Sequence, residues 1–170
     1  MSRNQIAQRL HTALPHLSTR AQTIVDALLL SGGDLGTAKQ LAFHIGESNR
    51  FGLARLLRRE GLPPLHSLAA WTRVLIWVDT AERSGCSLCQ LAFRYKKDPA
   101  VCYRTVKRVT GLKWGDLRRR GSLRVIADFI AICGAHDGPR WSQSEHLAAS
   151  AHRAGGDRLH LSDRPAELRG

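Results

Sequence analysis

The sequence predicts an all-α protein: two helix-turn-helix units joined by a long linker helix, followed by a C-terminal helix and a mobile tail. Apolar residues recur three or four positions apart through most of the chain before residue 134, which is the spacing of helices that bury one face. Gln-Leu-Ala-Phe at 40–43 returns at 90–93. Three further matches keep the same offset of 50: Arg58 with Arg108, Gly61 with Gly111, and Leu62 with Leu112. We therefore interpret the two stretches as homologous units.

Composition limits the class of protein and its partners. The 170 residues are 43% hydrophobic, which is enough for a globular core, and the net charge is +12. Nucleic acid is the commonest partner of such a charge. The sequence contains no signal-peptide core and no apolar run long enough to span a membrane, and its four cysteines show no secreted disulfide pattern. We expect a cytoplasmic protein with reduced thiols.

Two helices are expected before the first unit. Residues 4–14 are amphipathic and end at Pro15, and we assign residues 1–17 to this N-terminal helix and its exit. Packing on the rest of the protein is the favoured role of this helix, and pairing with a partner is the alternative. Ser18 is the predicted N-cap of a second helix that reaches about Leu30.

The first unit has residues 36–45 as its first helix, and Ser48 is the predicted N-cap of its second. Asn can bond adenine and Arg can bond guanine, each through two hydrogen bonds in the DNA major groove. The candidate DNA-binding residues of this unit are Ser48, Asn49, Arg50, Arg55 and Arg58.

The longest predicted helix begins at Leu65 or Ser67, reaches about Arg83 and separates the two units. It carries Trp71 and Trp77 among its apolar residues. Tryptophans can stack on single-stranded bases, but at this helical spacing core packing is the favoured interpretation.

The second unit places its first helix at residues 87–95. Asp98 and Pro99 then suit the N-cap and first position of a helix that stops at Gly111. The expected buried face of that helix is Val101, Cys102, Val106 and Val109. The candidate DNA-binding residues of this unit are Lys96, Lys97, Ala100, Tyr103, Arg104, Lys107, Arg108 and Lys113.

Residues 19–121 resemble the DNA-binding domain of the AraC/XylS family of bacterial transcription regulators. The resemblance rests on Leu41-Ala42 with Gly46, Leu53-Ala54-Arg55-Leu56-Leu57-Arg58 with Gly61, Asp98-Pro99, Tyr103-Arg104-Thr105-Val106-Lys107-Arg108, Gly111 and Leu117-Arg118. The family implies two recognition helices in successive major grooves. Where its second turn usually has a glycine and an aromatic residue, this chain has Tyr95-Lys96 or Lys96-Lys97. The usual ligand-sensing domain of the family has no counterpart here, so we expect no small-molecule inducer, or control through a partner or through expression level.

After the second unit we expect a short closing helix at 113–119 and a buried helix at 122–133. The predicted segments are thus 1–17, a tandem helix-turn-helix domain at 18–121, a C-terminal helix at 122–135, and a mobile tail at 136–170 that is rich in Gly, Ser, Asp, Arg and His.

No catalytic or metal site is predicted. Cys86 and Cys89 have the spacing of half a zinc site, but no His lies between Cys89 and Cys102 to complete it. A phosphate-binding glycine loop, a nucleophile elbow and a paired-carboxylate cleft are also missing from the sequence. We expect neither enzymatic activity nor a cofactor.

The function predicted from the sequence is sequence-specific binding of double-stranded DNA by a transcription regulator, with RNA polymerase or another regulator as a further candidate partner. The alternatives are a nonspecific nucleic-acid or nucleoid-associated binder driven by charge, and a helical protein-interaction adaptor.

Overall fold

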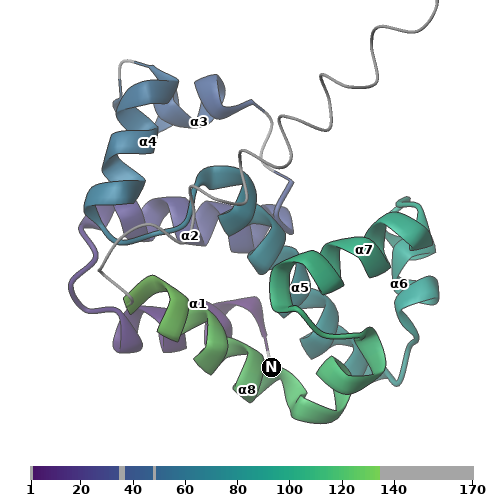
Figure 1. Ribbon diagram of the computed structural model, residues 1–170. Helices are drawn as coiled ribbons and strands as arrows, with labels where there is room; N and C mark the ends of the chain where they lie inside the picture. The colour runs from purple at the N-terminus through teal and green to yellow at the C-terminus, as the bar shows by residue number, and fades with distance from the viewer. Residues whose placement is uncertain (1, 35–36, 48, 135–170) are drawn as a thin grey trace, which may run out of the picture. The chain divides into compact units, whose positions relative to one another are not determined.

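The computed structural model describes residues 2–34, 37–47 and 49–134, and every regular element in these ranges is a helix. The all-α prediction is therefore confirmed. Figure 1 shows the helices in chain order. They are α1 (Arg3–Ala13), α2 (Thr19–Ser31), α3 (Ala38–His44), α4 (Arg50–Arg59), α5 (Leu65–Ser84), α6 (Leu88–Arg94), α7 (Pro99–Thr110) and α8 (Trp114–Gly134).

Local sequence explains where most helices begin and end. The Ser18 hydroxyl accepts a hydrogen bond from the Ala21 N–H, so Ser18 is the N-cap of α2 as predicted. Asp98 caps α7 and Pro99 takes its first position, also as predicted. Gly111 ends α7 with a φ of 73°, a conformation that glycine adopts without steric cost.

Helix α5 is the central element, and it packs against α2, α6, α7 and α8. It is buried along most of its length. Trp71 and Trp77 both lie in the core, and the ring of Trp71 lies 5.8 Å from that of Phe129 of α8, between centroids. The core interpretation of both tryptophans is confirmed, and stacking on single-stranded bases is not open to them.

Helix α8 consists of two helical segments that meet at Gly121. The φ of 80° and ψ of 162° at Gly121 are not helical, so the closing helix and the buried helix predicted separately run one after the other. The Glu82 carboxylate accepts a hydrogen bond from the Ser122 N–H (2.7 Å) and so caps the second segment from α5.

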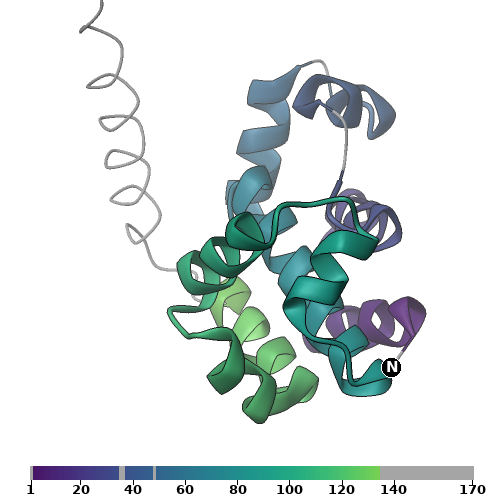
Figure 2. The same cartoon turned by 90° about the vertical axis from the view of Figure 1, so that its right-hand side faces the viewer.

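Helix α1 packs against α2 and α8. Figure 1 shows these three helices next to one another, and Figure 2 gives the view turned by 90°. Ile6, Leu10 and Leu14 are buried there, so the packing role expected for this helix is confirmed. One hydrophobic core extends from Ile6 to Cys133. The segments 1–17, 18–121 and 122–134 therefore fold around a shared core, and the predicted tail at 136–170 lies outside the described residues.

None of the helices in the described part of the chain is both long enough and apolar enough to cross a membrane.

Candidate nucleic-acid interface

The two repeats fold as two similar helix pairs, α3 with α4 and α6 with α7. The first helices begin with the same cap. The Thr37 hydroxyl accepts the Gln40 N–H while the Gln40 side chain accepts the Thr37 N–H (2.9 Å). Ser87 and Gln90 make the same reciprocal pair, with 2.8 Å for the second bond. This capping box satisfies two backbone donors and fixes how the chain enters each pair.

The turns between the helices also match, bond for bond. Glu47 and Lys97 each donate their N–H to the alanine carbonyl of the repeated Gln-Leu-Ala-Phe, at 2.9 and 2.8 Å. Gly46 has a φ of 74° and Lys96 a φ of 53°. Lys96 therefore occupies the place of the turn glycine, which decides between the two alignments left open by the sequence: Lys96-Lys97 stand where the first unit has Gly46-Glu47.

After the turn, the second unit is one residue shorter. The N-cap of α4 is Asn49 and that of α7 is Asp98, an offset of 49 instead of 50. The buried residues keep this new offset: Leu53, Leu56 and Leu57 of α4 correspond to Cys102, Thr105 and Val106 of α7.

This shift changes which basic residues are equivalent. Arg55 corresponds to Arg104, and Arg58 corresponds to Lys107, so the match of Arg58 with Arg108 read from the sequence is wrong. The offset of 50 returns at Gly61 and Gly111 because α7 runs longer than α4 before its final glycine.

Val101 is the one residue that was assigned to the wrong face of α7. It is 46% exposed, whereas Cys102 and Val106 are buried and Val109 is half-buried. Val101 lies one residue before the inward-facing Cys102, and the helical phase turns its side chain toward solvent. The corresponding Gly52 of α4 is instead buried against Glu47.

Asn49, and not Ser48, is the N-cap of α4, which corrects the sequence prediction; Ser48 itself lies outside the described residues. The Asn49 side-chain oxygen accepts the N–H groups of Phe51 (2.9 Å) and Gly52 (3.0 Å). Because that oxygen is used by the cap, Asn49 cannot make the expected bidentate contact with adenine unless the helix start opens.

Both ends of α4 are tied to α2. At its start, the carboxylate of Glu47 lies 3.3 Å from the Arg20 guanidinium and against Gly52, where a side chain would displace it. At its end, the Glu60 carboxylate accepts the Ser18 N–H (2.7 Å). The exposed residues of α4 therefore lie on a helix that is held to α2 at both ends.

The pKa of Glu60 reflects this contact. Burial alone would raise the pKa of this carboxyl, but the hydrogen bonds from Ser18 and the nearby Arg59 guanidinium outweigh burial and hold the pKa below its ordinary value. Glu60 is therefore charged at neutral pH, and its carboxylate both joins α4 to α2 through Ser18 and pairs with Arg59.

The outer face of α4 is basic, and it includes an aromatic residue that the sequence analysis did not select. Arg50, Arg55 and Arg58 are exposed. Phe51 is 63% exposed, and the Arg50 guanidinium lies 4.9 Å from its ring centroid. The sequence could have identified Phe51 as exposed, because a helix that turns Leu53 inward points residue 51 outward in its first turn.

The outer face of α7 carries the predicted residues in exposed positions: Ala100, Tyr103, Arg104, Lys107 and Arg108, with Lys96 before the helix and Lys113 after it. Lys97 differs from them because its ammonium lies 3.1 Å from the carboxylate of Asp34. Asp34 also lies 3.4 Å from the guanidinium of Arg73 of α5. Lys97 is thus partly neutralised by an acid that belongs to the loop before α3.

An exposed phenylalanine occupies the same position in both units. Phe43 of α3 is 81% exposed and Phe93 of α6 is 68% exposed, at the shared last position of Gln-Leu-Ala-Phe. Large apolar side chains are unusual at such exposure. Because both phenylalanines belong to the repeated motif, the sequence already showed that they are equivalent.

In the described ranges, no group of His, Cys, Asp and Glu side chains is arranged to hold a metal ion. Cys86 and Cys89 are free thiols and half-exposed. The chain matches no family model, no curated protein and no solved structure.

Proposed function

We propose that the protein is a sequence-specific regulator of transcription that binds double-stranded DNA in the cytoplasm, without enzymatic activity or a cofactor. One observation carries the proposal. The two helix pairs repeat the same capping box and turn, and each presents the outer face of its second helix as an exposed basic surface, with Arg55 and Arg104 at equivalent positions.

The dimensions and chemistry of these helices suit the major groove. An α-helix with its side chains is about 10–12 Å wide and the groove is about 12 Å wide. Arg and Lys at the groove edges neutralise phosphates, whereas an Arg that points to the groove floor bonds the O6 and N7 of guanine. Arg58 and Lys107 have the first role in this proposal, and Arg55 and Arg104 have the second.

The start of α4 offers the more specific contacts. Arg50 is exposed at its first position, and the exposed ring of Phe51 can contact the methyl group of thymine. The start of α7 offers only Pro99 and Ala100, beyond the acidic cap Asp98. We therefore expect the DNA segment bound by α4 to be more constrained in sequence than the segment bound by α7.

The test is selection of bound sequences from random duplex DNA, followed by footprinting of the selected site. The proposal predicts two protected major-groove segments about one helical turn, or 34–36 Å, apart. Protection of a single segment would contradict the use of both units. A selection that enriches no sequence would favour the charge-driven nonspecific binder, which the net charge of +12 supports as the second candidate.

The exposed Phe43 and Phe93 could contact another protein. They therefore support the adaptor alternative and also a contact of the DNA-binding regulator with RNA polymerase or another regulator. Replacing both by Ser separates the adaptor from the DNA binder. A DNA-binding regulator keeps its affinity for the selected duplex in the double variant, whereas a pure adaptor shows no duplex selection in either form.

A further inference from the structure

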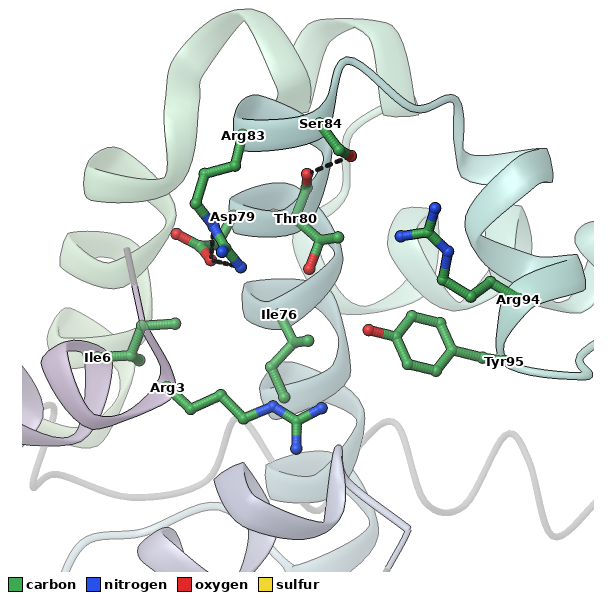
Figure 3. A pocket seen from close by; sticks show the side chains of 9 residues that line it. All are labelled: Arg3, Ile6, Ile76, Asp79, Thr80, Arg83, Ser84, Arg94 and Tyr95. Carbon is green, nitrogen blue, oxygen red and sulfur yellow. Dashed lines mark hydrogen bonds and ion pairs between the residues drawn. The ribbon is translucent and has the colours of Figure 1, made fainter.

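A pocket of about 390 Å³ lies between α1, α5 and the end of α6. Figure 3 shows its lining: Arg3 from α1, Asp79, Thr80 and Arg83 from α5, and Arg94 with Tyr95 from α6 and its C-cap. The volume is in the lower part of the range for small-molecule sites, about 300–1,000 Å³.

The charges of this pocket are unbalanced. Arg83 lies 3.0 Å from the carboxylate of Asp79, so these two charges offset each other. Arg3 donates a hydrogen bond to the neutral carbonyl of Leu30 (2.6 Å), and the Arg94 guanidinium lies 3.9 Å from the Cys86 sulfur. Neither Arg3 nor Arg94 has a carboxylate partner among the described residues, and their positive charge remains available to a ligand.

The surrounding polar groups fit one kind of anion. Guanidinium groups bind phosphate through paired N–H···O bonds, and the hydroxyls of Thr80 and Tyr95 also line the pocket. Ile6 and Ile76 supply an apolar wall for the rest of a small molecule. Arginines from two separate helices that face one space are the usual arrangement for a bound phosphate group.

We propose that this pocket binds a small phosphorylated metabolite, held by Arg3 and Arg94, and that the ligand controls DNA binding by α7. The regulatory half rests on the proposed function, and it replaces the expectation from the sequence that no small molecule acts as an inducer. Arg94 is the last residue of α6 and Tyr95 its C-cap, so the next residue is Lys96, whose φ of 53° forms the turn into α7. A ligand that fixes Arg94 and Tyr95 acts on the turn that aims α7, and it also joins that turn to α1 through Arg3.

Ligand binding is tested first, without DNA, on the full chain. Inorganic phosphate and glycerol 3-phosphate are titrated calorimetrically at constant ionic strength, with glycerol and chloride as blanks. We expect Arg94→Gln and Arg3→Gln each to weaken glycerol 3-phosphate binding at least tenfold. Arg9→Gln removes an exposed arginine of the same helix α1 outside this pocket, and it should leave binding unchanged.

Equal weakening by Arg9→Gln and Arg94→Gln, with thermal unfolding unchanged in both, would show general charge attraction and overturn the pocket proposal. Failure of the wild-type chain to bind either phosphate probe beyond the blanks would overturn it as well. Both results leave the DNA-binding proposal intact, because neither experiment contains DNA.

The regulatory half is tested by titrating the selected duplex with and without glycerol 3-phosphate. We expect the ligand to change duplex affinity by at least threefold in the wild type and by nothing in Arg94→Gln. Ligand binding with no change in duplex affinity would overturn the regulatory half. Competition between the ligand and duplex of every sequence alike would assign the pocket to DNA phosphates and overturn the proposal.

Discussion

The two helix pairs reach the same turn from different residues. In the pair α3–α4 the turn residue is Gly46, with nothing within 4 Å of where a side chain would begin, whereas in α6–α7 the same place holds Lys96. The hydrogen bonds around both turns are the same. The turn is therefore specified by the capping box and by the returning N–H, and the open space allows a lysine there for about 1–2 kcal/mol of backbone strain.

The pairs diverge immediately after the turn. The loop of the second pair is one residue shorter, and its cap is a carboxylate, Asp98, where the first has the neutral Asn49. In the proposed complex with DNA, a carboxylate at this place would repel the phosphates, and α7 would depend more on Arg104 and Lys107 farther along the helix. The first pair is also tied to α2 by Glu47 and Glu60. Within the proposed function, we therefore expect α4 to contribute more to sequence recognition than α7.

The largest expected effect concerns Glu60, which has no acidic counterpart in the second unit. Glu60→Gln should cost about 1–2 kcal/mol of stability at neutral pH, because the hydrogen bond from Ser18 then goes to a neutral acceptor and the ion pair with Arg59 is lost. The folded-state pKa lies below the ordinary value of 4.5, so the charge stabilises the fold above that pH. This contribution is lost as the pH falls through the lowered pKa.

Denaturant unfolding between pH 3 and pH 7 measures this contribution. The wild type should lose more stability on acidification than Glu60→Gln, and Thr110→Ala, at the corresponding end of α7, should keep the wild-type pH slope. If the unfolding free energy depends on pH equally in the wild type and in Glu60→Gln, the Glu60 charge does not stabilise the first unit, and the proposed difference between the two units is wrong.

The next effect separates base reading from phosphate contact. Arg104→Ala should cost about 1–3 kcal/mol of affinity for the selected duplex and relax the preference at one position. Its equivalent Arg55→Ala should do the same in the other segment. Lys107→Ala should weaken binding to all sequences alike and lower the salt slope by about one unit. Duplex titrations at several salt concentrations distinguish these patterns, and an unchanged sequence preference in Arg104→Ala would exclude it as a base reader.

A reciprocal exchange at the turns has a smaller effect. Gly46→Lys should destabilise the fold by about 1 kcal/mol because it introduces the strain that Lys96 already carries. Lys96→Gly should be close to neutral or slightly stabilising, and it should lower the salt slope of DNA binding. Thermal unfolding of both variants measures the exchange. A large loss of stability in Lys96→Gly would mean that the lysine side chain itself holds the second turn.

The smallest effect is expected from Asp34→Asn, which releases Lys97. An exposed ion pair contributes at most about 1 kcal/mol, so stability should change little. The released ammonium should bind a phosphate, raise affinity for every duplex and increase the salt slope. Asp34→Asn combined with Lys97→Ala is the matched control and should abolish the gain. A gain that persists in this double variant would show that Asp34 acts through Arg73 instead.

Helix positions, most caps and the repeat were predictable because each leaves a local pattern in the sequence. The cap of α4 was not, since Ser48 and Asn49 are adjacent and have similar capping propensity. The shorter second loop was also hidden: the offset of 50 holds before it and returns at Gly111, so Arg58 was matched to Arg108 instead of Lys107. The pairing of Lys97 with Asp34 depends on a tertiary contact, which no local pattern records.

The four cysteines differ in chemical reactivity. Burial raises the pKa of the Cys133 thiol to about 12, and burial together with the Asp98 carboxylate raises that of Cys102. The thiolate is the form that attacks thiol reagents, so Cys102 and Cys133 are unreactive at neutral pH, whereas Cys86 and Cys89 are half-exposed at the start of α6. A maleimide dye should label the native chain at these two positions alone. Because Cys86 lies beside Arg94, the wild-type protein carries its own attachment point for a fluorescent report of pocket occupancy.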